Sequence, residues 1–422
     1  MKTPDKRRGS VFIIVLVVCL GLVSLTIVFG HSMVMAYRGE ETALAGREAE
    51  QAIQGAVRYA EYLMANTDTP GYLPDSSDYQ SEAVPVGDAA FWFIGEPLSS
   101  SATDAPSFGL VDEASKLNLN TASVAMLENL PNMTPDLAQA IVSWRSANAA
   151  TSATASTSKG GPFESVDELA QVNEENGGDP AILYGDDLNL NHVLDAGENS
   201  GGGNFNPGLF EYVTVFSREP NTLPDGTRRA DVTQSSAALL PVLTSAFGSS
   251  RAQAIIRRLG GGSVRSVLEF YIRGGLTEAE LDEVTPKLTM GGGTFKTGLI
   301  DVNTASAAVL QCVPGITQAL ATQLVSARQN QAAPYTNLAW VSPILGTAAS
   351  VQAGPYLTTQ SFQWTADVGA VGRYGRGYRR TLFVIDSSTG APQIVYRRNL
   401  ASLGWALGPA ALQNLGQAKV MQ

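Results

Sequence analysis

SVFIIVLVVCLGLVSLTIVFG, residues 10–30, is an uninterrupted stretch of 21 residues without a charged side chain. At about 1.5 Å per residue, a helix of this length measures about 32 Å, which matches the roughly 30 Å hydrocarbon thickness of a bilayer. The residues just before it are basic: Lys2, Lys6, Arg7 and Arg8. Such a basic flank is typical of a cytoplasmic N-terminus. The stretch therefore predicts a single-pass membrane helix.

The helical pattern continues beyond this stretch, from His31 to about Asn66, without a proline. Small and apolar residues recur there at steps of three and four, and charged residues occupy the remaining positions. The recurring residues are Ala49, Ala52, Ile53, Ala56, Ala60, Leu63 and Met64. We expect one helix over residues 10–66, which leaves the membrane and continues as an amphipathic stem.

A plausible processing site lies in front of the apolar stretch, between Gly9 and Ser10. A secretory signal has a shorter apolar core, and its cleavage site follows that core. Cleavage after Gly9 would instead leave the hydrophobic helix on the mature chain. The segment alone also fits an ordinary signal anchor on an unrelated exported protein.

Composition limits the classes of function. The chain has 422 residues, enough for two to three folding units, and its net charge of −11 opposes general affinity for nucleic acids. Only His31 and His192 are available for histidine chemistry, and no nucleophile elbow or phosphate loop occurs. Cys19 and Cys312 lie in very different contexts, so we expect no disulfide between them. The sequence predicts no enzymatic activity.

The chain contains an internal repeat that aligns without a gap. Residues 118–145 read NLNTASVAMLENLPNMTPDLAQAIVSWR, and residues 301–328 read DVNTASAAVLQCVPGITQALATQLVSAR. Capping residues, a short apolar helix, a tight turn and a second helix follow one another in both copies. A degenerate third copy, DVTQSSAALL, occupies residues 231–240. The repeat predicts helical hairpins.

These hairpins resemble helix-hairpin-helix modules, many of which bind DNA through hairpin amides and nearby basic residues. Three features oppose that function here. Asn132 replaces a hairpin glycine, each copy offers mainly one arginine, Arg145 or Arg328, and the first copy carries the acids Glu128 and Asp136. Two interpretations therefore stand: a packed helical domain, or a membrane-anchored protein for DNA binding and uptake.

Residues 187–198, DLNLNHVLDAGE, fit the twelve-residue template of a calcium loop. Oxygen ligands would come from alternate positions and the last one: Asp187, Asn189, Asn191, the carbonyl of Val193, Asp195 and Glu198. Two charges on calcium would offset the crowded carboxylates. His192 stands where glycine normally provides a left-handed turn, which histidine tolerates at some cost. The alternative is a polar surface turn.

Short runs of β-branched and aromatic residues predict strands on both sides of the repeats. We expect them at residues 91–94, 108–111, 212–216, 361–368, 380–385 and 393–396. The last three should form an antiparallel meander. The fold class is therefore α+β, with a helical region inserted into a small antiparallel sheet. The expected divisions are 1–9, 10–66, 67–120, 121–350 and 351–422.

A basic leader that ends in Gly9, followed directly by the apolar stem, resembles the type IV pilin and pseudopilin family. The resemblance implies that prepilin peptidase cuts after Gly9 and that the new N-terminus, Ser10, is methylated. Most pilins carry a glutamate at the fifth mature position, where this chain has Ile14. A subunit with no neighbour above it can dispense with that buried carboxylate.

The repeats narrow the resemblance to the minor pseudopilin K family of type II secretion systems, which carries similar NxNTA and LPG segments in a helical insertion. It implies a subunit at the pseudopilus tip that supports protein export. It also implies other minor pseudopilins and an inner-membrane assembly platform as partners. The chain would lie in the inner membrane with most of its residues in the periplasm. Members of this family bind calcium, which agrees with the loop.

Overall fold

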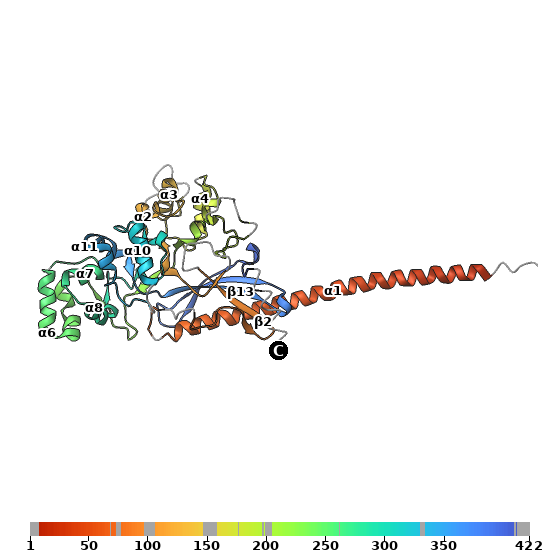
Figure 1. Cartoon of the computed structure of the whole chain (residues 1–422), viewed down its shortest axis with the longest axis horizontal. Helices are drawn as coiled ribbons and strands as arrows, with labels where there is room; N and C mark the ends of the chain where they lie inside the picture. Colours follow the sequence, from red (N-terminus) through yellow and green to blue (C-terminus); the bar gives the residue numbers. More distant parts are fainter. Residues whose placement is uncertain are drawn as a thin grey trace, which may run out of the picture.

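The computed structural model describes residues 8–67, 69–72, 77–96, 106–146, 158–175, 177–195, 198, 205–260, 262–329, 334–408 and 411. It confirms the α+β class: a long N-terminal helix, an antiparallel sheet and a helical region (Figure 1). Residues 1–7 of the proposed leader lie outside the described residues.

Helix α1 (Arg8–Ala65) is continuous, as the sequence predicts for residues 10–66. Its first half projects from the folded body (Figure 1), and large apolar side chains from Val11 to Leu44 are exposed. This segment is long and apolar enough to cross a membrane. Cys19 lies in it and is exposed, whereas Cys312 is buried, and both cysteines are free as expected.

The main sheet has the order β1-β2-β13-β14-β15, and neighbouring strands along this path are antiparallel. Its strands are β1 (Val84–Val86), β2 (Ala89–Gly95), β13 (Gln363–Val371), β14 (Arg379–Asp386) and β15 (Gln393–Asn399). The expected strands at 91–94, 361–368, 380–385 and 393–396 are thus confirmed, including the meander.

Two other expected strands are shorter than predicted. Residues 108–111 do not form one strand: β3 (Ser107–Phe108) pairs with β2, and β4 (Val111–Asp112) pairs with β13. Residues 212–216 are reduced to β6 (Val213–Thr214). In both places the available backbone partners, and not β-propensity, set the length of the strand.

The second half of α1 packs on one face of this sheet. Alternation along β2 directs Phe91 and Phe93 towards α1, while Trp92 and Ile94 enter a second cluster on the other face. The helix side of this contact consists mainly of alanines, which let the backbones come close. A Cβ added at Gly372, for example, would lie 2.1 Å from the carbonyl oxygen of Ala45.

Carboxylates of the stem also form ion pairs with arginines of the sheet and its turn. Glu48 pairs with Arg373, and Glu41 pairs with Arg376 at 3.1 Å. A third pair joins Glu50 and Arg397, also at 3.1 Å. Because these pairs are partly exposed, each contributes modestly to stability. Apolar burial provides most of the free energy that holds the second half of α1 on the sheet.

The helical region consists of three modules, each closed by a short pair of parallel strands within the described residues. Module 1 lies between β5 (Leu117–Asn118) and β6, and module 2 between β8 (Ala230–Asp231) and β9 (Leu288–Thr289). Module 3 lies between β11 (Ile300–Asp301) and β12 (Leu357–Thr358). The three bridged modules together run from Leu117 to Thr358.

Along the chain, the helices of each module lie between its two strands. Module 1 contains α2 (Val124–Leu127), α3 (Pro135–Arg145), α4 (Glu168–Glu175) and α5 (Ala181–Tyr184). Module 2 contains α6 (Leu240–Leu259), α7 (Val267–Gly274) and α8 (Glu278–Val284). Module 3 contains α9 (Ala307–Leu310), α10 (Gln318–Gln329) and α11 (Val341–Ala353). Modules 1 and 3 share most of one apolar core, whereas module 2 has largely its own.

Each module opens with the same side-chain turn. Asn118, Asp231 and Asp301 hold equivalent positions, and each accepts a hydrogen bond from the backbone N–H two residues later. This local bond turns the chain from the strand towards the first helix. Residues 231–240, the expected third copy of the repeat, thus begin with the same turn as the other two copies.

Candidate functional site

The two arginines that sequence analysis singled out in the hairpins are used inside the fold. Arg145 donates from its guanidinium to the carbonyl oxygens of Leu119 and Ala122. Arg328 makes the equivalent bonds to Val302 at 2.9 Å and to Ala305 at 2.6 Å. Each guanidinium therefore fastens the second hairpin helix to the turn that starts its own module.

The hairpin turns adopt the left-handed conformation that the repeat requires. Asn132 has φ +58° and Gly315 has φ +89° at equivalent positions. Asparagine reaches this region more easily than most residues, so the first copy folds without a glycine. In the second copy a Cβ at Gly315 would lie 3.0 Å from Cβ of Gln352, since α11 packs against the turn. That neighbour explains why the second copy needs glycine.

Replacing Arg328 by methionine should lower the free energy of unfolding by about 1–3 kcal/mol, because buried carbonyl oxygens then lose their donors. Chemical denaturation of the full chain in detergent measures this change. Arg265, whose side chain is 67% exposed, provides the control, and Arg265→Met should change stability by less than about 0.5 kcal/mol. Equal effects of the two substitutions would contradict the internal role of Arg328.

The residues of the predicted calcium loop converge through their own hydrogen bonds. Both carboxylate oxygens of Asp187 accept backbone N–H groups, from Asn191 at 3.0 Å and from His192 at 2.7 Å. Glu198 accepts from the N–H groups of Leu188, Asn189 and Asp195. Asn189 and Asn191 both donate from their amides to Asp195. The first and last residues of the template thus hold the loop backbone in a closed turn through their carboxylates.

Two backbone positions take the left-handed conformation, Leu190 with φ +54° and His192 with φ +62°. His192 therefore makes the turn at the position where the template has glycine. Val193 is buried, whereas residues 196 and 197 lie outside the described part of the loop. Before the loop, α5 is only one turn long, and Gly185 ends it. A full helix on this side of the loop is absent from the described residues.

The donor set fits a hard divalent cation. Asp187 and Asn191 are 1% and 0% exposed, and within the described residues the Oδ1 atom of Asn189 is buried without a hydrogen-bond partner. An unsatisfied buried oxygen costs about 1–3 kcal/mol, which a bound ion would offset. Burial also raises the pKa values of Asp187 and Glu198 above their usual range, so the ionised carboxylates gain from a nearby cation. Calcium prefers such oxygen ligands.

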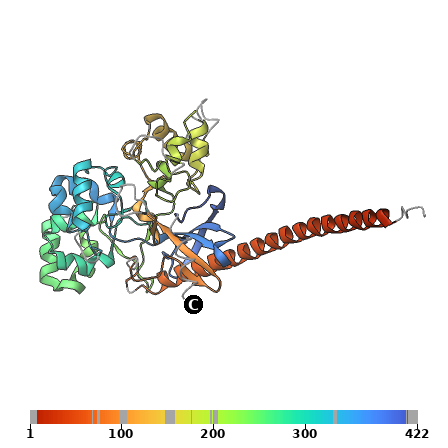
Figure 2. The same ribbon diagram turned by 45° about the vertical axis from the view of Figure 1, so that its right-hand side comes forward.

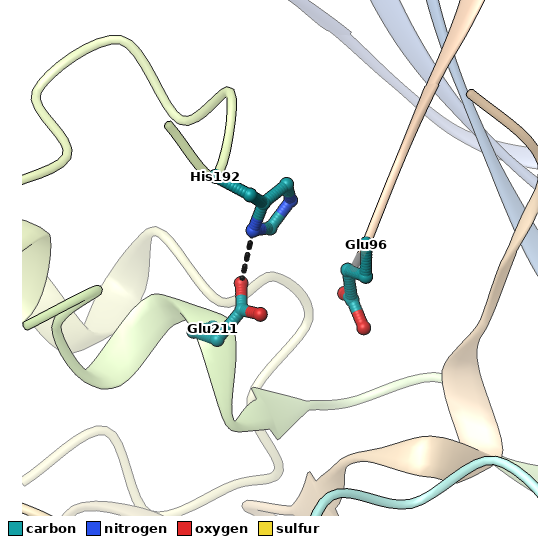
Figure 3. A group of neighbouring side chains, drawn as sticks. All are labelled: Glu96, His192 and Glu211. Atoms are coloured by element: carbon teal, nitrogen blue, oxygen red, sulfur yellow. Dashed lines mark ion pairs between the residues drawn. The ribbon is translucent and has the colours of Figure 1, made fainter. Parts of the chain in front are cut away.

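A charged cluster lies beside the loop, where Glu96, His192 and Glu211 point towards one another (Figure 3). Nδ1 of His192 lies 3.0 Å from a carboxylate oxygen of Glu211. Burial alone would lower the pKa of His192, but Glu211 outweighs it and raises the pKa to about 9. Nζ of Lys116 lies 2.6 Å from Glu96. Two cations and two carboxylates balance in charge, so we interpret the cluster as an ion-pair network.

Comparison with known proteins identifies the hairpins. Residues 112–174 and 296–339 match the family model of the helix-hairpin-helix motif. The chain carries two helix-hairpin-helix segments. They coincide with the hairpin parts of modules 1 and 3, and module 2 lies outside both matched ranges.

The chain is also similar to a chain in a solved structure, "The Crystal Structure of the GspK-GspI-GspJ complex from enterotoxigenic Escherichia coli Type 2 Secretion System". Sequence identity is 11%, and the TM-score is 0.36. The alignment covers 87% of this chain and 99% of that chain. No curated protein matches the sequence.

Sequence reasoning missed the residues that fasten the calcium-type loop to the rest of the protein. Glu96 follows β2, Lys116 precedes β5, and Glu211 ends the short helix η4 (Leu209–Glu211). Arg380 on β14 also contacts the loop. These residues come from four separate segments and form no local motif, so the sequence alone offers no signal that groups them.

Proposed function

We propose that this chain is a non-enzymatic minor pseudopilin of a type II secretion system. It is processed after Gly9 and crosses the inner membrane once. Its N-terminus lies in the cytoplasm and its folded body in the periplasm, where it joins other minor pseudopilins and supports protein export. Prepilin peptidase and an inner-membrane assembly platform complete its set of partners.

The observation that carries this proposal is the difference in burial between the two halves of α1. Large apolar side chains from Val11 to Leu44 are exposed, whereas residues from Ala45 to Met64 supply part of the sheet's core. One rigid helix therefore joins an apolar surface that needs a covering to a folded domain that needs none. A membrane first, and then the apolar stems of neighbouring subunits, would provide that covering.

Two features support a position at the tip. Ile14 stands where the family usually has a glutamate that neutralises a neighbour's terminal amine, so this stem lacks the group that would serve a subunit above it. Modules 2 and 3 also form a helical body at the end opposite the free part of α1, and module 1 lies above the sheet in the same views (Figures 1 and 2). Such a body would obstruct another subunit above it.

DNA binding is the second function that the helix-hairpin-helix match raises. In this chain Arg145 and Arg328 bond to carbonyl oxygens of their own modules, and the net charge is −11. Charge of this sign repels phosphate backbones. These observations favour a packing role for the hairpins, and we propose no nucleic-acid partner.

We further propose that the loop of residues 187–198 binds one structural calcium ion. Asp187, Asn189, Asn191, Val193, Asp195 and Glu198 would supply its oxygen ligands. The buried, unpaired Oδ1 atom of Asn189 is the main support. The ion would offset the clustered acidic charge and fix a segment that carries little regular secondary structure.

Co-purification from detergent-solubilised membranes tests the pseudopilin role. The full chain should bring down other single-span subunits with apolar stems, which mass spectrometry identifies. A shortened chain of residues 31–422 keeps Ala45 to Met64 in the core but lacks the apolar stretch, and it should lose these partners. Recovery of no such subunit with the full chain would contradict the proposal.

A further inference from the structure

Arg380 is a fully buried arginine that joins the sheet to the calcium-type loop. Its side chain is 0% exposed. On the sheet side, its Nε donates to Oδ1 of Asp367 at 3.0 Å and its Nη2 to Oδ2 at 2.6 Å. On the loop side, the same guanidinium donates to the carbonyl oxygen of Asn189 and, at 2.6 Å, to that of Leu190. Every bond therefore runs either to β13 or to the loop.

The two carbonyl oxygens belong to the third and fourth residues of the loop. Asn189 uses its carbonyl for Arg380, while its side-chain Oδ1 is the unpaired oxygen available to an ion. The amide Nδ2 of Asn189 also donates to the carbonyl of Trp405 at 3.2 Å. The orientation of this ligand is thus fixed from the sheet side by two groups outside the loop. Inside the loop, Asn189 is held only by its backbone N–H, which donates to Glu198, and by its amide, which donates to Asp195, so the two outside groups add constraints on the Oδ1 atom.

Electrostatics permits this arrangement next to a cation. Asp367 bonds to Arg380 through both carboxylate oxygens, so the pair carries no net charge. The guanidinium therefore offers rigid donors without adding net repulsion to a divalent ion. Arginine suits this task because its fork presents several N–H donors in fixed directions. A lysine would keep the charge but could not hold the carboxylate and both carbonyl groups in the same geometry.

We propose that Arg380 is a positioning residue that couples calcium binding in the loop to the docking of module 1 on the sheet. This inference rests on the calcium-binding role proposed above. Coupling between two equilibria is reciprocal: if docking on the sheet favours the ion, the ion must favour docking by the same factor. Calcium bound in the loop would then stabilise the contact between the helical region and the pilin-like sheet.

Isothermal titration of the full chain in detergent with calcium tests whether the contact of Arg380 with the loop strengthens calcium binding. Arg380→Lys should weaken calcium binding by about tenfold or more, the range observed when groups that orient metal ligands are removed. Arg373→Lys is the matched control, because Arg373 pairs with Glu48 of the stem, and it should leave the affinity unchanged. Equal affinities of Arg380→Lys and the unaltered chain would overturn the coupling while leaving the calcium site intact.

Hydrogen exchange tests whether calcium binding in turn stabilises the docking of module 1 on the sheet, and it needs no substitution. In the unaltered chain, calcium should slow amide exchange in the loop and also in residues 363–386, which include β13 and β14. Protection confined to the loop would overturn the coupling, even if Arg380→Lys fails to fold. Absence of calcium binding to the unaltered chain would remove the calcium proposal and this inference together. The two failures are therefore distinguishable.

Discussion

Gly9→Leu should abolish removal of the leader, so that the membrane-bound chain keeps residues 1–9. In the proposed family, the peptidase cuts directly after this glycine. Glycine lets another backbone approach closely because it has no Cβ, and a leucine side chain would occupy that space. The site lies in the first turn of α1, which begins at Arg8. Helix ends fray readily, so the backbone there can open for cleavage.

Intact-mass measurement of the membrane fraction reads this result directly. The unaltered chain should begin at Ser10, and its terminal amine should carry a methyl group. Gly21→Leu is the matched control, since a Cβ at Gly21 would meet no atom within 4 Å and Gly21 lies well inside the apolar stretch. It should be processed normally. Normal processing of Gly9→Leu would argue against a prepilin-type leader.

Asp187→Ala should eliminate the rise in thermal midpoint that calcium gives the unaltered chain. An ion that binds only the folded state stabilises it by about 1.4–2.7 kcal/mol at free concentrations of 10 to 100 times Kd. For a chain of this size, that free energy corresponds to a shift of about 2–3 °C. Asp187 is central because both of its oxygens organise the loop and because its buried carboxylate most needs a counter-charge.

Differential scanning calorimetry of the full chain in detergent, with calcium or with a chelator, measures this shift. Leu188→Ala provides a control within the same loop, because its side chain is 57% exposed and offers no oxygen. This variant should keep the calcium-dependent shift. A shift that survives Asp187→Ala would place the ion elsewhere, and no shift in the unaltered chain would end the calcium proposal.

Local patterns predicted those parts of the fold that depend on neighbours in sequence. Steps of three and four predicted α1, because one helical face must collect the residues that pack on the sheet. Short runs of β-branched and aromatic residues predicted β2 and the meander of β13, β14 and β15, because such side chains pack well on a pleated sheet. The strands expected at 108–111 and 212–216 were only partly right, since the length of a strand depends on a partner that lies far away in the chain.

The same distinction applies to the candidate sites. Ligand order in residues 187–198 is a local property, because the template spans twelve consecutive residues and the turn needs only suitable backbone angles at His192. The roles of Arg145 and Arg328 were not readable in this way. In a helix-hairpin-helix pattern such arginines are possible phosphate contacts, but an arginine serves equally well as a donor to buried carbonyl oxygens, and only the fold shows which acceptors it meets.

The sequence by itself determined the apolar stem, the repeated hairpins and the oxygen donors of the loop, because each is encoded by residues close together in the chain. Tertiary structure alone decided how these parts are joined. Three kinds of contact bring together distant segments of the chain: the parallel strands that close the modules, the cluster of Glu96, His192 and Glu211, and the attachment of the loop to Arg380. In the last case the bonded residues lie 191 positions apart. Such contacts form only when burial of the shared cores pays the entropy of closing long loops, and no local pattern records them.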